Sequence, residues 1–224
     1  MNVDDLKRLV SLGEGLQIEF KHRVPRPDRI AREVIALANT RGGKVFLGVD
    51  DAGAVVGVKD PEEEIYALRV ALDAHCEPPV RLSIEGVRVS RRREVLVVDV
   101  PESAQKPHFL VEEELEEDAP GAAGAPALKR TAYLRLGSHS VEASRESVRL
   151  MRAERNPSDV RFTFGDAEQQ LMRYLERHER VTVRQYARLA ALKERDASHA
   201  LVLLTRARVL RHHADAGEDY FTAG

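Results

Sequence analysis

Two glutamates and a lysine near the start of the chain have types and a spacing that suit phosphate chemistry. Glu14 and Glu19 are five residues apart in the segment GEGLQIEFK, and Lys21 follows two residues later. Side chains alternate between faces along an extended segment, so Glu19 and Lys21 are expected on one side. Carboxylates are ligands that Mg²⁺ and Mn²⁺ prefer, and a lysine ammonium binds phosphate as a point charge. The alternative is that Glu14 caps a helix and that Glu19 and Lys21 are a solvated pair on a strand.

A second acidic pair, Asp50 and Asp51, directly follows the apolar segment KVFLGV at 44–49. That segment predicts a buried strand, which would deliver both carboxylates at its end. The next two residues, Ala52-Gly53, are equally typical of a tight hairpin turn, because Asp and Gly tolerate turn geometry. The pattern leaves open whether this pair belongs to a site or only to a turn.

Positive charge gathers in two clusters of the N-terminal half. The clusters consist of Arg23, Arg26 and Arg29, close after Lys21, and of Arg91, Arg92 and Arg93 at an expected hairpin tip. Clustered arginines can grip a nucleic-acid backbone, although a solvated surface is the alternative.

The elements expected up to residue 153 mix helical and strand periodicity, which predicts an α+β domain. Helices are expected at 28–39, where Asp28 would be the cap, at 62–75 and at 144–154. Strands are expected at 44–49, 54–58, 80–89, 94–100 and 131–136. His108 could act as an acid or base near a phosphate, but a surface histidine at a strand end is the alternative.

Residues 111–129 interrupt this pattern with an acidic stretch that becomes rich in Ala, Gly and Pro. The part from Val111 to Leu128 holds six acidic residues and no basic one. It has too little apolar content to pack, so a mobile loop between two strands is expected. Without this part the chain has 35 basic and 31 acidic residues, so the net charge of −2 hides a basic bias.

The elements expected after Asn156-Pro157 follow the outline of a winged helix-turn-helix. They are a helix at 166–178, a short strand at 181–183, helices at 184–191 and 195–206, and a hairpin of 209–213 and 220–222.

The third of these helices would offer side chains to a DNA groove. The candidates are Lys193, Arg195, Ser198 and His199, with Arg206, Arg208 and Arg211 near the wing. Glu194 and Asp196 would repel phosphate, and residues 160–224 carry only 11 basic against 9 acidic residues. Because a DNA reader is usually more basic, protein contact or dimer formation is the alternative for this segment.

Composition excludes several classes of protein. The chain has 224 residues, of which 43% are hydrophobic and 32% charged, so one large or two modest domains are expected. A single cysteine, Cys76, excludes a disulfide scaffold and a cysteine-cluster zinc site. No run of about 18 apolar residues occurs, and the start has no signal-peptide pattern, so a cytoplasmic protein without membrane contact is expected. Lys44 follows two glycines, but no G-x4-G-K-[ST] motif for ATP is present.

Four motifs in order resemble the Schlafen AlbA-type domain, also called the divergent AAA-type domain. They are E-x4-E-F-K at 14–21, A-N-T-x-G-G-x4-G-V-D-D-x-G-x3-G at 38–57, QKPHFL at 105–110 and AYLRLGSHSVEAS at 132–144. The resemblance covers roughly residues 8–150, and the acidic stretch falls between two of the motifs.

The resemblance implies contact with nucleic acid in one of two styles. Bacterial members of the family often combine the domain with a winged helix as a DNA-binding or regulatory module. In animal Schlafen proteins a related domain cleaves transfer and ribosomal RNA with three carboxylates and a divalent metal. Matched onto this chain, those carboxylates would be Glu14, Glu19 and Asp50, with Asp51 as a substitute, and they would hold Mg²⁺ or Mn²⁺.

These observations together predict a two-domain protein. A mixed-sheet α+β Schlafen AlbA-type domain is expected at 1–155 and a winged helix-turn-helix domain at 160–224. The expected function is nucleic-acid binding as a homodimeric DNA-binding transcriptional regulator. The alternatives are a metal-dependent endoribonuclease and a protein-interaction module whose acidic stretch docks a basic partner.

Overall fold

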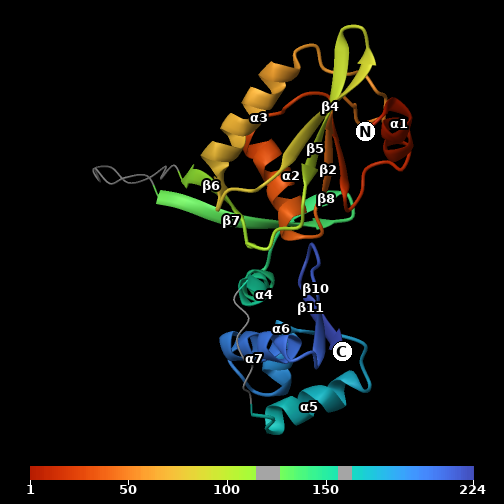
Figure 1. Cartoon of the computed structure of the whole chain (residues 1–224). Helices are drawn as coiled ribbons and strands as arrows, with labels where there is room; N and C mark the ends of the chain where they lie inside the picture. The colour runs from red at the N-terminus through yellow and green to blue at the C-terminus, as the bar shows by residue number, and fades with distance from the viewer. Residues whose placement is uncertain (115–126, 156–162) are drawn as a thin grey trace. The chain divides into compact units, whose positions relative to one another are not determined.

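The computed structural model of the chain describes residues 1–114, 127–155 and 163–224 (Figure 1). Its contacts divide the chain into two units, Met1–Glu142 and Ala143–Gly224. Helix α4 (Arg145–Arg155) therefore falls in the second unit, whereas the sequence placed this helix at the end of the first domain. Among the described residues, no helix combines the length and the apolar character that crossing a membrane requires.

A mixed four-stranded sheet lies in the described part of the first unit. Its strands, in spatial order, are β1 (Ile18–Lys21), β2 (Gly43–Leu47), β5 (Arg93–Val100) and β4 (Ser83–Ser90). β1 runs parallel to β2, and the other neighbours are antiparallel. This sheet, with the helices that accompany it, confirms the predicted mixed-sheet α+β class.

A second, antiparallel sheet forms from later parts of the same unit. Its strands, in spatial order, are β3 (Cys76–Glu77), β6 (Phe109–Glu114), β7 (Ala127–Leu136) and β8 (His139–Glu142). Because β6 and β7 pair from Phe109 with Ala132 to Glu114 with Ala127, both ends of the expected mobile loop at 111–129 are strand instead. The rest of that loop prediction, at 115–126, lies outside the described residues.

Helix α2 (Pro27–Asn39) joins the two sheets through an apolar side that is fully buried. Ile30, Val34 and Leu37 have no exposed surface, and they pack in one core with residues of both sheets and of α3 (Pro61–His75). Arg26 holds the cap position with Pro27 in the first turn, so the prediction that Asp28 caps this helix is wrong. Proline suits that place because its missing N–H would have no partner there.

Further differences from the predicted elements of the first unit include a helix at residues 3–10 and the segment at 54–58. Helix α1 (Val3–Val10) was not expected, and it begins where the side chain of Asn2 accepts a hydrogen bond from the amide of Asp5. The expected strand at 54–58 is replaced by two isolated bridges, from Val55 to Val49 and from Val58 to Glu94. Glycines with positive φ at 53 and 57 bend this segment, which prevents a continuous ladder.

The second unit has its elements in the predicted order. After α4 come α5 (Asp166–Leu175), β9 (Val181–Thr182), α6 (Val183–Leu189), α7 (Glu194–Arg206), β10 (Leu210–His213) and β11 (Tyr220–Ala223). The three strands form an antiparallel sheet in the order β10, β11, β9. Leu171, Tyr186, Leu201 and Phe221 form the centre of a separate core. The interpretation of this unit as a winged helix-turn-helix stays a prediction.

Candidate functional site

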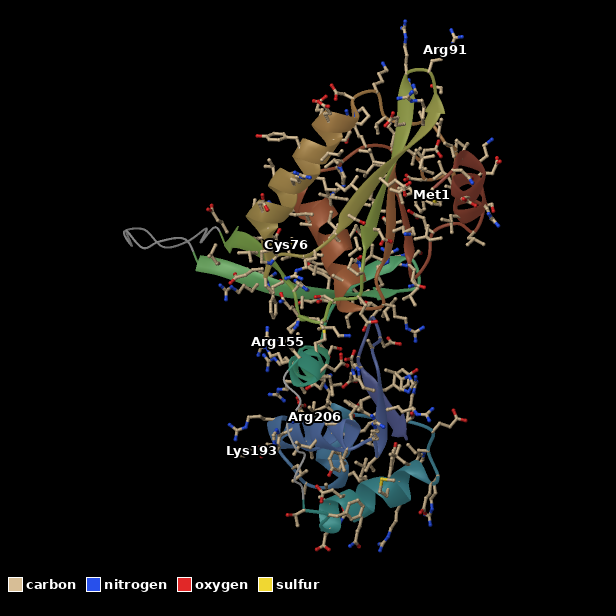
Figure 2. The ribbon with its side chains drawn as sticks, in the orientation of Figure 1. Met1, Cys76, Arg91, Arg155, Lys193 and Arg206 are labelled. Atoms are coloured by element: carbon tan, nitrogen blue, oxygen red, sulfur yellow. The ribbon has the colours of Figure 1, made fainter. Side chains whose placement is uncertain are left out.

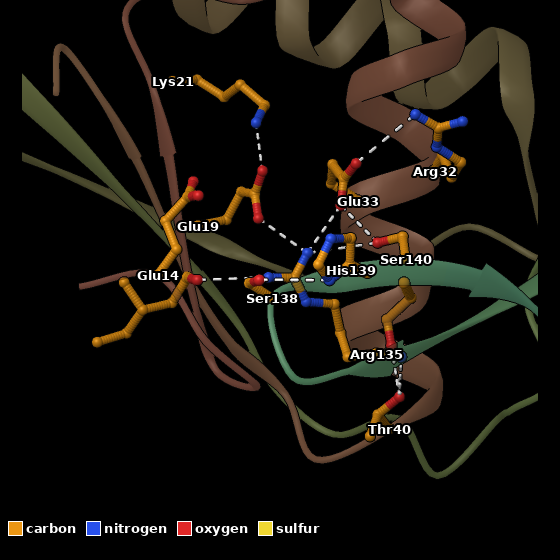
Figure 3. Close-up of polar contacts among 12 residues, drawn as sticks. Glu14, Glu19, Lys21, Arg32, Glu33, Thr40, Arg135, Ser138, His139 and Ser140 are labelled. Atoms are coloured by element: carbon orange, nitrogen blue, oxygen red, sulfur yellow. Dashed lines mark hydrogen bonds and ion pairs between the residues drawn. The ribbon is translucent and has the colours of Figure 1, made fainter. Parts of the chain in front are cut away.

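Several motif residues of the first unit meet around one buried arginine, Arg135 on β7 (Figure 3). Arg135 is only 1% exposed. Its Nη1 lies 2.9 Å from Glu33 Oε2 and 2.8 Å from Glu19 Oε2, and its Nη2 donates to the carbonyl of Gly15 at 2.8 Å. A buried guanidinium is stable only where carboxylates and carbonyls replace its water. The arrangement therefore ties β1, α2 and β7 together.

Arg135, Glu19 and Glu33 form what we call the Arg135 cluster. Glu19, one of the predicted metal ligands, is therefore part of this cluster. It is 4% exposed, and its Oε1 pairs with the ammonium of Lys21. The contact between its Oε2 and Arg135 is close but lacks hydrogen-bond alignment, so the attraction is mainly coulombic. Glu19 and Lys21 lie on one side of β1, as the alternation of side chains predicts. Lys21, the expected phosphate ligand, thus has a carboxylate partner within the protein.

Asn39 and Thr40 join the same motifs through their side chains. Asn39 is 2% exposed; its Nδ2 donates to the carbonyls of His108 and Tyr133 at 2.9 and 3.0 Å, and its Oδ1 accepts from the amide of His108 at 2.8 Å. Thr40 Oγ1 accepts from the amide of Arg135 at 2.9 Å and donates to the carbonyl of Ala36 at 2.8 Å. These contacts attach the end of α2 to β6 and β7.

His108 is buried, with 1% of its surface exposed, so the prediction of a surface histidine is wrong. Its Nδ1 lies 2.7 Å from the carbonyl of Pro78, which can only accept, so Nδ1 carries the proton. Its Nε2 lies 2.6 Å from Ser103 Oγ and accepts from that hydroxyl. Burial lowers the pKa of His108, outweighing the opposite effect of the hydrogen bond to Pro78. The ring is therefore a neutral structural bridge.

Asp50 closes a turn. Its Oδ1 accepts from the amides of Ala52 and Ala54 at 3.0 and 2.8 Å, which is the local hydrogen bonding that makes Asp favourable in turns. Glu14 accepts from the amide of Phe20 at 2.9 Å. Of the two alternatives left open by the sequence, the turn accounts for the contacts of Asp50.

A cavity of about 430 Å³ brings together two of the predicted acidic residues. Glu14 and Asp51 line it, with Lys7 and Ser11 as the other polar side chains. Its apolar lining comes from Val10, Phe20 and Val55, and the remaining lining is Gly13, Ala52 and Gly53. Glu19 and Asp50 do not line this cavity, so the structure separates the predicted carboxylates into different environments.

A three-carboxylate metal site does not fit this arrangement. Within the described parts of the chain, no three His, Cys, Asp or Glu side chains are grouped so that they could hold a metal ion. Glu19 already faces two cations, and Oδ1 of Asp50 accepts both side-chain hydrogen bonds of its turn.

The predicted basic residues of the first unit have different surroundings. Arg91 and Arg92 are exposed at the tip of the β4–β5 hairpin, and Figure 2 shows Arg91 at the far end of that hairpin. Arg93 is half-buried and donates to the carbonyl of Gly57 at 2.9 Å, which fixes the base of the hairpin. Arg23 is exposed just after β1. Arg91, Arg92 and Arg23 thus remain available to a partner.

Some of the predicted contact residues at α7 are exposed, and one is buried. Lys193, Arg195 and His199 are exposed. Ser198 is only 5% exposed, because its hydroxyl contacts Glu146 and accepts from Arg149 Nη1 at 2.7 Å, both on α4. A buried side chain with these partners cannot contact a DNA base, so Ser198 is not part of the candidate interface.

The remaining candidates flank the hairpin of the second unit. Arg206 is half-buried at the end of α7, whereas Arg208 is exposed with a φ of 60°. The structure thus places a charged residue at the turn into β10, close to the predicted wing.

The sequence reasoning missed Arg135, Glu33 and Asn39 as central residues. Arg135 lies between Leu134 and Leu136, so alternation alone would place it on the face opposite these apolar side chains and gives no sign of a buried arginine. Such an arginine needs buried acidic partners, which points to Glu19 and Glu33.

Comparisons with known proteins place these motifs in a family. A family model described as Schlafen, AlbA_2 matches residues 14–144, more than half of the chain. No curated protein matches the sequence.

Four chains of solved structures match. One is the N-terminal domain of a RecG-related protein from Nitrosomonas europaea, with 27% identity over 62% of this chain and 91% of that chain and a TM-score of 0.41. Another is the DIP2311 protein from Corynebacterium diphtheriae, with 18% identity over 72% of this chain and 32% of that chain and a TM-score of 0.41.

Proposed function

The chain belongs to the Schlafen, AlbA_2 family, and from that premise we propose that it is a nucleic-acid-binding protein, acting as a DNA-binding transcriptional regulator. Family membership supports a role with nucleic acid in general. The narrower role rests on the second unit, in which a helix, a short strand, two helices and a hairpin follow the order of a winged helix-turn-helix.

One observation carries the choice of binding over cleavage: the motif carboxylates have structural partners. Glu19 forms ion pairs with Arg135 and Lys21, and Asp50 Oδ1 holds the turn after β2. A metal-dependent nuclease needs carboxylate oxygens that are free to bind the ion and to leave room for the phosphate. In contrast, the side chains of Arg91 and Arg92 at the hairpin tip and of Lys193 and His199 at α7 are exposed.

The proposed interface consists of exposed basic residues on both units. In the first unit these are Arg23, Arg91 and Arg92; in the second they are Lys193, Arg195, His199 and Arg208, and the half-buried Arg206 at the end of α7 is included with them. Winged helices often pair on DNA about a two-fold axis, so we propose a homodimer as the binding species. Sedimentation of the full chain with and without duplex DNA tests the dimer.

The experiment for the regulator is selection of binding sites from a random pool of duplex DNA by the purified full chain. Enrichment of one sequence, lost in Arg195→Gln with His199→Gln, is the expected result. A matched control is Arg173→Gln with His178→Gln, which removes the same exposed residue types from the last turn of α5 and from the segment that follows it. Binding without enrichment would contradict regulation by sequence-specific contact.

A second candidate, the metal-dependent endoribonuclease, is favoured by one observation: Glu14 and Asp51 line the same cavity. Incubation of the chain with transfer RNA and duplex DNA, in Mn²⁺ or EDTA, separates the two functions. Cleavage that requires Mn²⁺ and disappears in Glu14→Gln with Asp51→Asn would replace the regulator. These substitutions avoid Glu19, whose loss would disturb the Arg135 cluster. The third alternative, docking through the acidic stretch, concerns mainly residues 115–126, which lie outside the described residues.

A further inference from the structure

Helix α4 carries the positive charge that α7 lacks. In α7, Arg195 and Arg206 are offset by Glu194 and Asp196, so the helix has no net formal charge. In α4, four arginines stand against two glutamates, a net charge of +2 in 11 residues. Affinity for DNA comes largely from contacts between cations and phosphates, so a neutral helix alone is a weak DNA ligand.

The N-terminal end of α4 is attached to the hairpin of the same unit by Asp219. This carboxylate is 7% exposed and accepts from the hydroxyls of Ser144 and Ser147 and pairs with His212. Burial acts to raise the pKa of Asp219, but hydrogen bonds from His212 and Ser144 outweigh it and the pKa is lowered. The ionised carboxylate therefore holds the start of α4 in place, and it favours a helix N-terminus.

A second attachment joins α4 to α7 itself. Ser198 on α7 lies between Glu146 and Arg149 of α4, in contact with both side chains. Met151 on α4 and Val202 on α7 are also buried, at 5% and 6% exposure. Because both its end and its middle are held, α4 lies against α7 in a fixed register rather than as a loose tail.

The face of α4 that points away from these attachments is lined by arginines. Arg145, Arg152 and Arg155 are exposed, whereas Ser147 and Met151 are buried. At 3.6 residues per turn, these three arginines lie within an arc of about 80°. Figure 2 shows Arg155 at the end of α4, in the same unit as Lys193 and Arg206. We call Arg145, Arg152 and Arg155 the arginine stripe.

We propose that the arginine stripe binds the phosphate backbone of duplex DNA beside the groove that receives α7. The inference rests on the proposed function, because it assigns a further contact surface to the same interface. Arginine suits this task, since its planar guanidinium can donate two parallel hydrogen bonds to one phosphate. The stripe positions the unit on DNA, and α7 supplies the contacts with bases.

The test compares the salt dependence of DNA binding by the full chain and two double variants. Fluorescence anisotropy with a labelled duplex measures the binding constant between 50 and 200 mM KCl. Arg152→Gln with Arg155→Gln removes two charges from the last turn of α4. Arg173→Gln with Arg177→Gln is the matched control, because it removes one exposed arginine from the last turn of α5 and another from the segment just after it.

Each phosphate contact contributes about 0.9 to the slope of log K against log salt, so the stripe variant should lose about 1.8. When KCl is raised from 50 to 200 mM, the factor by which the stripe variant loses affinity should then be about 12-fold smaller than the factor for the unmodified chain. An unchanged slope, or an equal fall in the control, overturns the proposal. A fall seen only with transfer RNA overturns the assignment to duplex DNA.

The binding of the unmodified chain and one further measurement keep the outcomes separate. If the unmodified chain binds no duplex, the proposed function fails together with this inference; if it binds with a slope that the stripe variant shares, only the inference fails. Hydrogen exchange of the peptides from α4 shows whether the variant keeps this helix folded. If α4 in the variant exchanges freely, Arg145→Gln, which removes one charge from the first turn, replaces it, with an expected loss of slope of about 0.9.

Discussion

Replacing Arg135 by alanine should destabilise the first unit by about 3–5 kcal/mol, because the change removes the buried cation that Glu19 and Glu33 share. Glu19 is 4% exposed, and its Oε2 lies 2.8 Å from Arg135 Nη1. Glu33 Oε2 lies 2.9 Å from the same nitrogen. Whole domains are stable by only about 5–15 kcal/mol, so this one residue would account for a large share.

The matched control is Arg130→Ala on the same strand, β7. Arg130 pairs with Glu77 at 2.8 Å, the same distance as in the buried pair, but the two side chains are 55% and 52% exposed. Water screens this pair and solvates each partner after the other is removed, so a loss of about 0–1 kcal/mol is expected. Residue type, strand and ion-pair distance are equal in the two cases, whereas burial and the number of partners differ.

The assay is hydrogen exchange under increasing urea, because it measures each unit separately and the chain has no tryptophan for fluorescence. Peptides from α2 and β7 report on the first unit, and peptides from α7 report on the second. We expect Arg135→Ala to lower the urea midpoint of the first unit only. Equal midpoints for Arg135→Ala and Arg130→Ala would refute the reasoning that the buried cluster holds these elements together.

Three further predictions concern the same unit. Asn39→Ala should lower the free energy of unfolding in urea by about 2–3 kcal/mol, because buried backbone groups lose their hydrogen-bond partners. Gln17→Ala loses one exposed hydrogen bond and should lower it by less than about 1 kcal/mol. Gly43→Ala should lower the free energy of unfolding by about 1–3 kcal/mol, because the added Cβ would lie 2.5 Å from the backbone oxygen of Gln17. A Cβ added at Gly15 would have nothing within 4 Å, so Gly15→Ala should leave the stability unchanged. Equal melting curves for the two variants would contradict this reasoning. Burial lowers the pKa of His108 below its usual 6.5, so the unfolded chain binds a proton at this residue more readily than the folded chain does. The free energy of unfolding should therefore fall as the pH drops below about 6.5. In a series of unfolding measurements at different pH values, His108→Gln should remove this part of the pH dependence.

Helices and strands with a strong hydrophobic period could be predicted from the sequence. α2, α3 and β5 bury regular sets of apolar residues, and each begins and ends close to its predicted bounds. Segments without such a period were harder to predict. α1 depends on the cap at Asn2, and the segment at 54–58 depends on how its glycines bend.

The chemistry of the candidate site was harder to predict because its partners are distant in sequence. The acidic motif near residue 14 suggests a metal site as long as its residues are considered alone. Arg135 changes that interpretation, but it lies 102 residues from Glu33, with which it forms the cluster. Similarly, the burial of Ser198 depends on α4, a helix that the sequence assigned to another domain. Spacing along the chain reveals neither contact.

The buried cluster also explains what the family motifs specify in this chain. Asn39, Thr40, His108 and Arg135 belong to three different motifs, and their side chains contact one another or each other's backbone. These contacts hold β1, α2, β6 and β7 together, so a chain could keep all the motifs for the sake of its fold alone. The exposed arginines at 91 and 92 and the arginine stripe lie outside the motifs. Since partners bind to exposed groups, differences in function within such a fold should arise from these surfaces, and variants there should change nucleic-acid binding without changing stability.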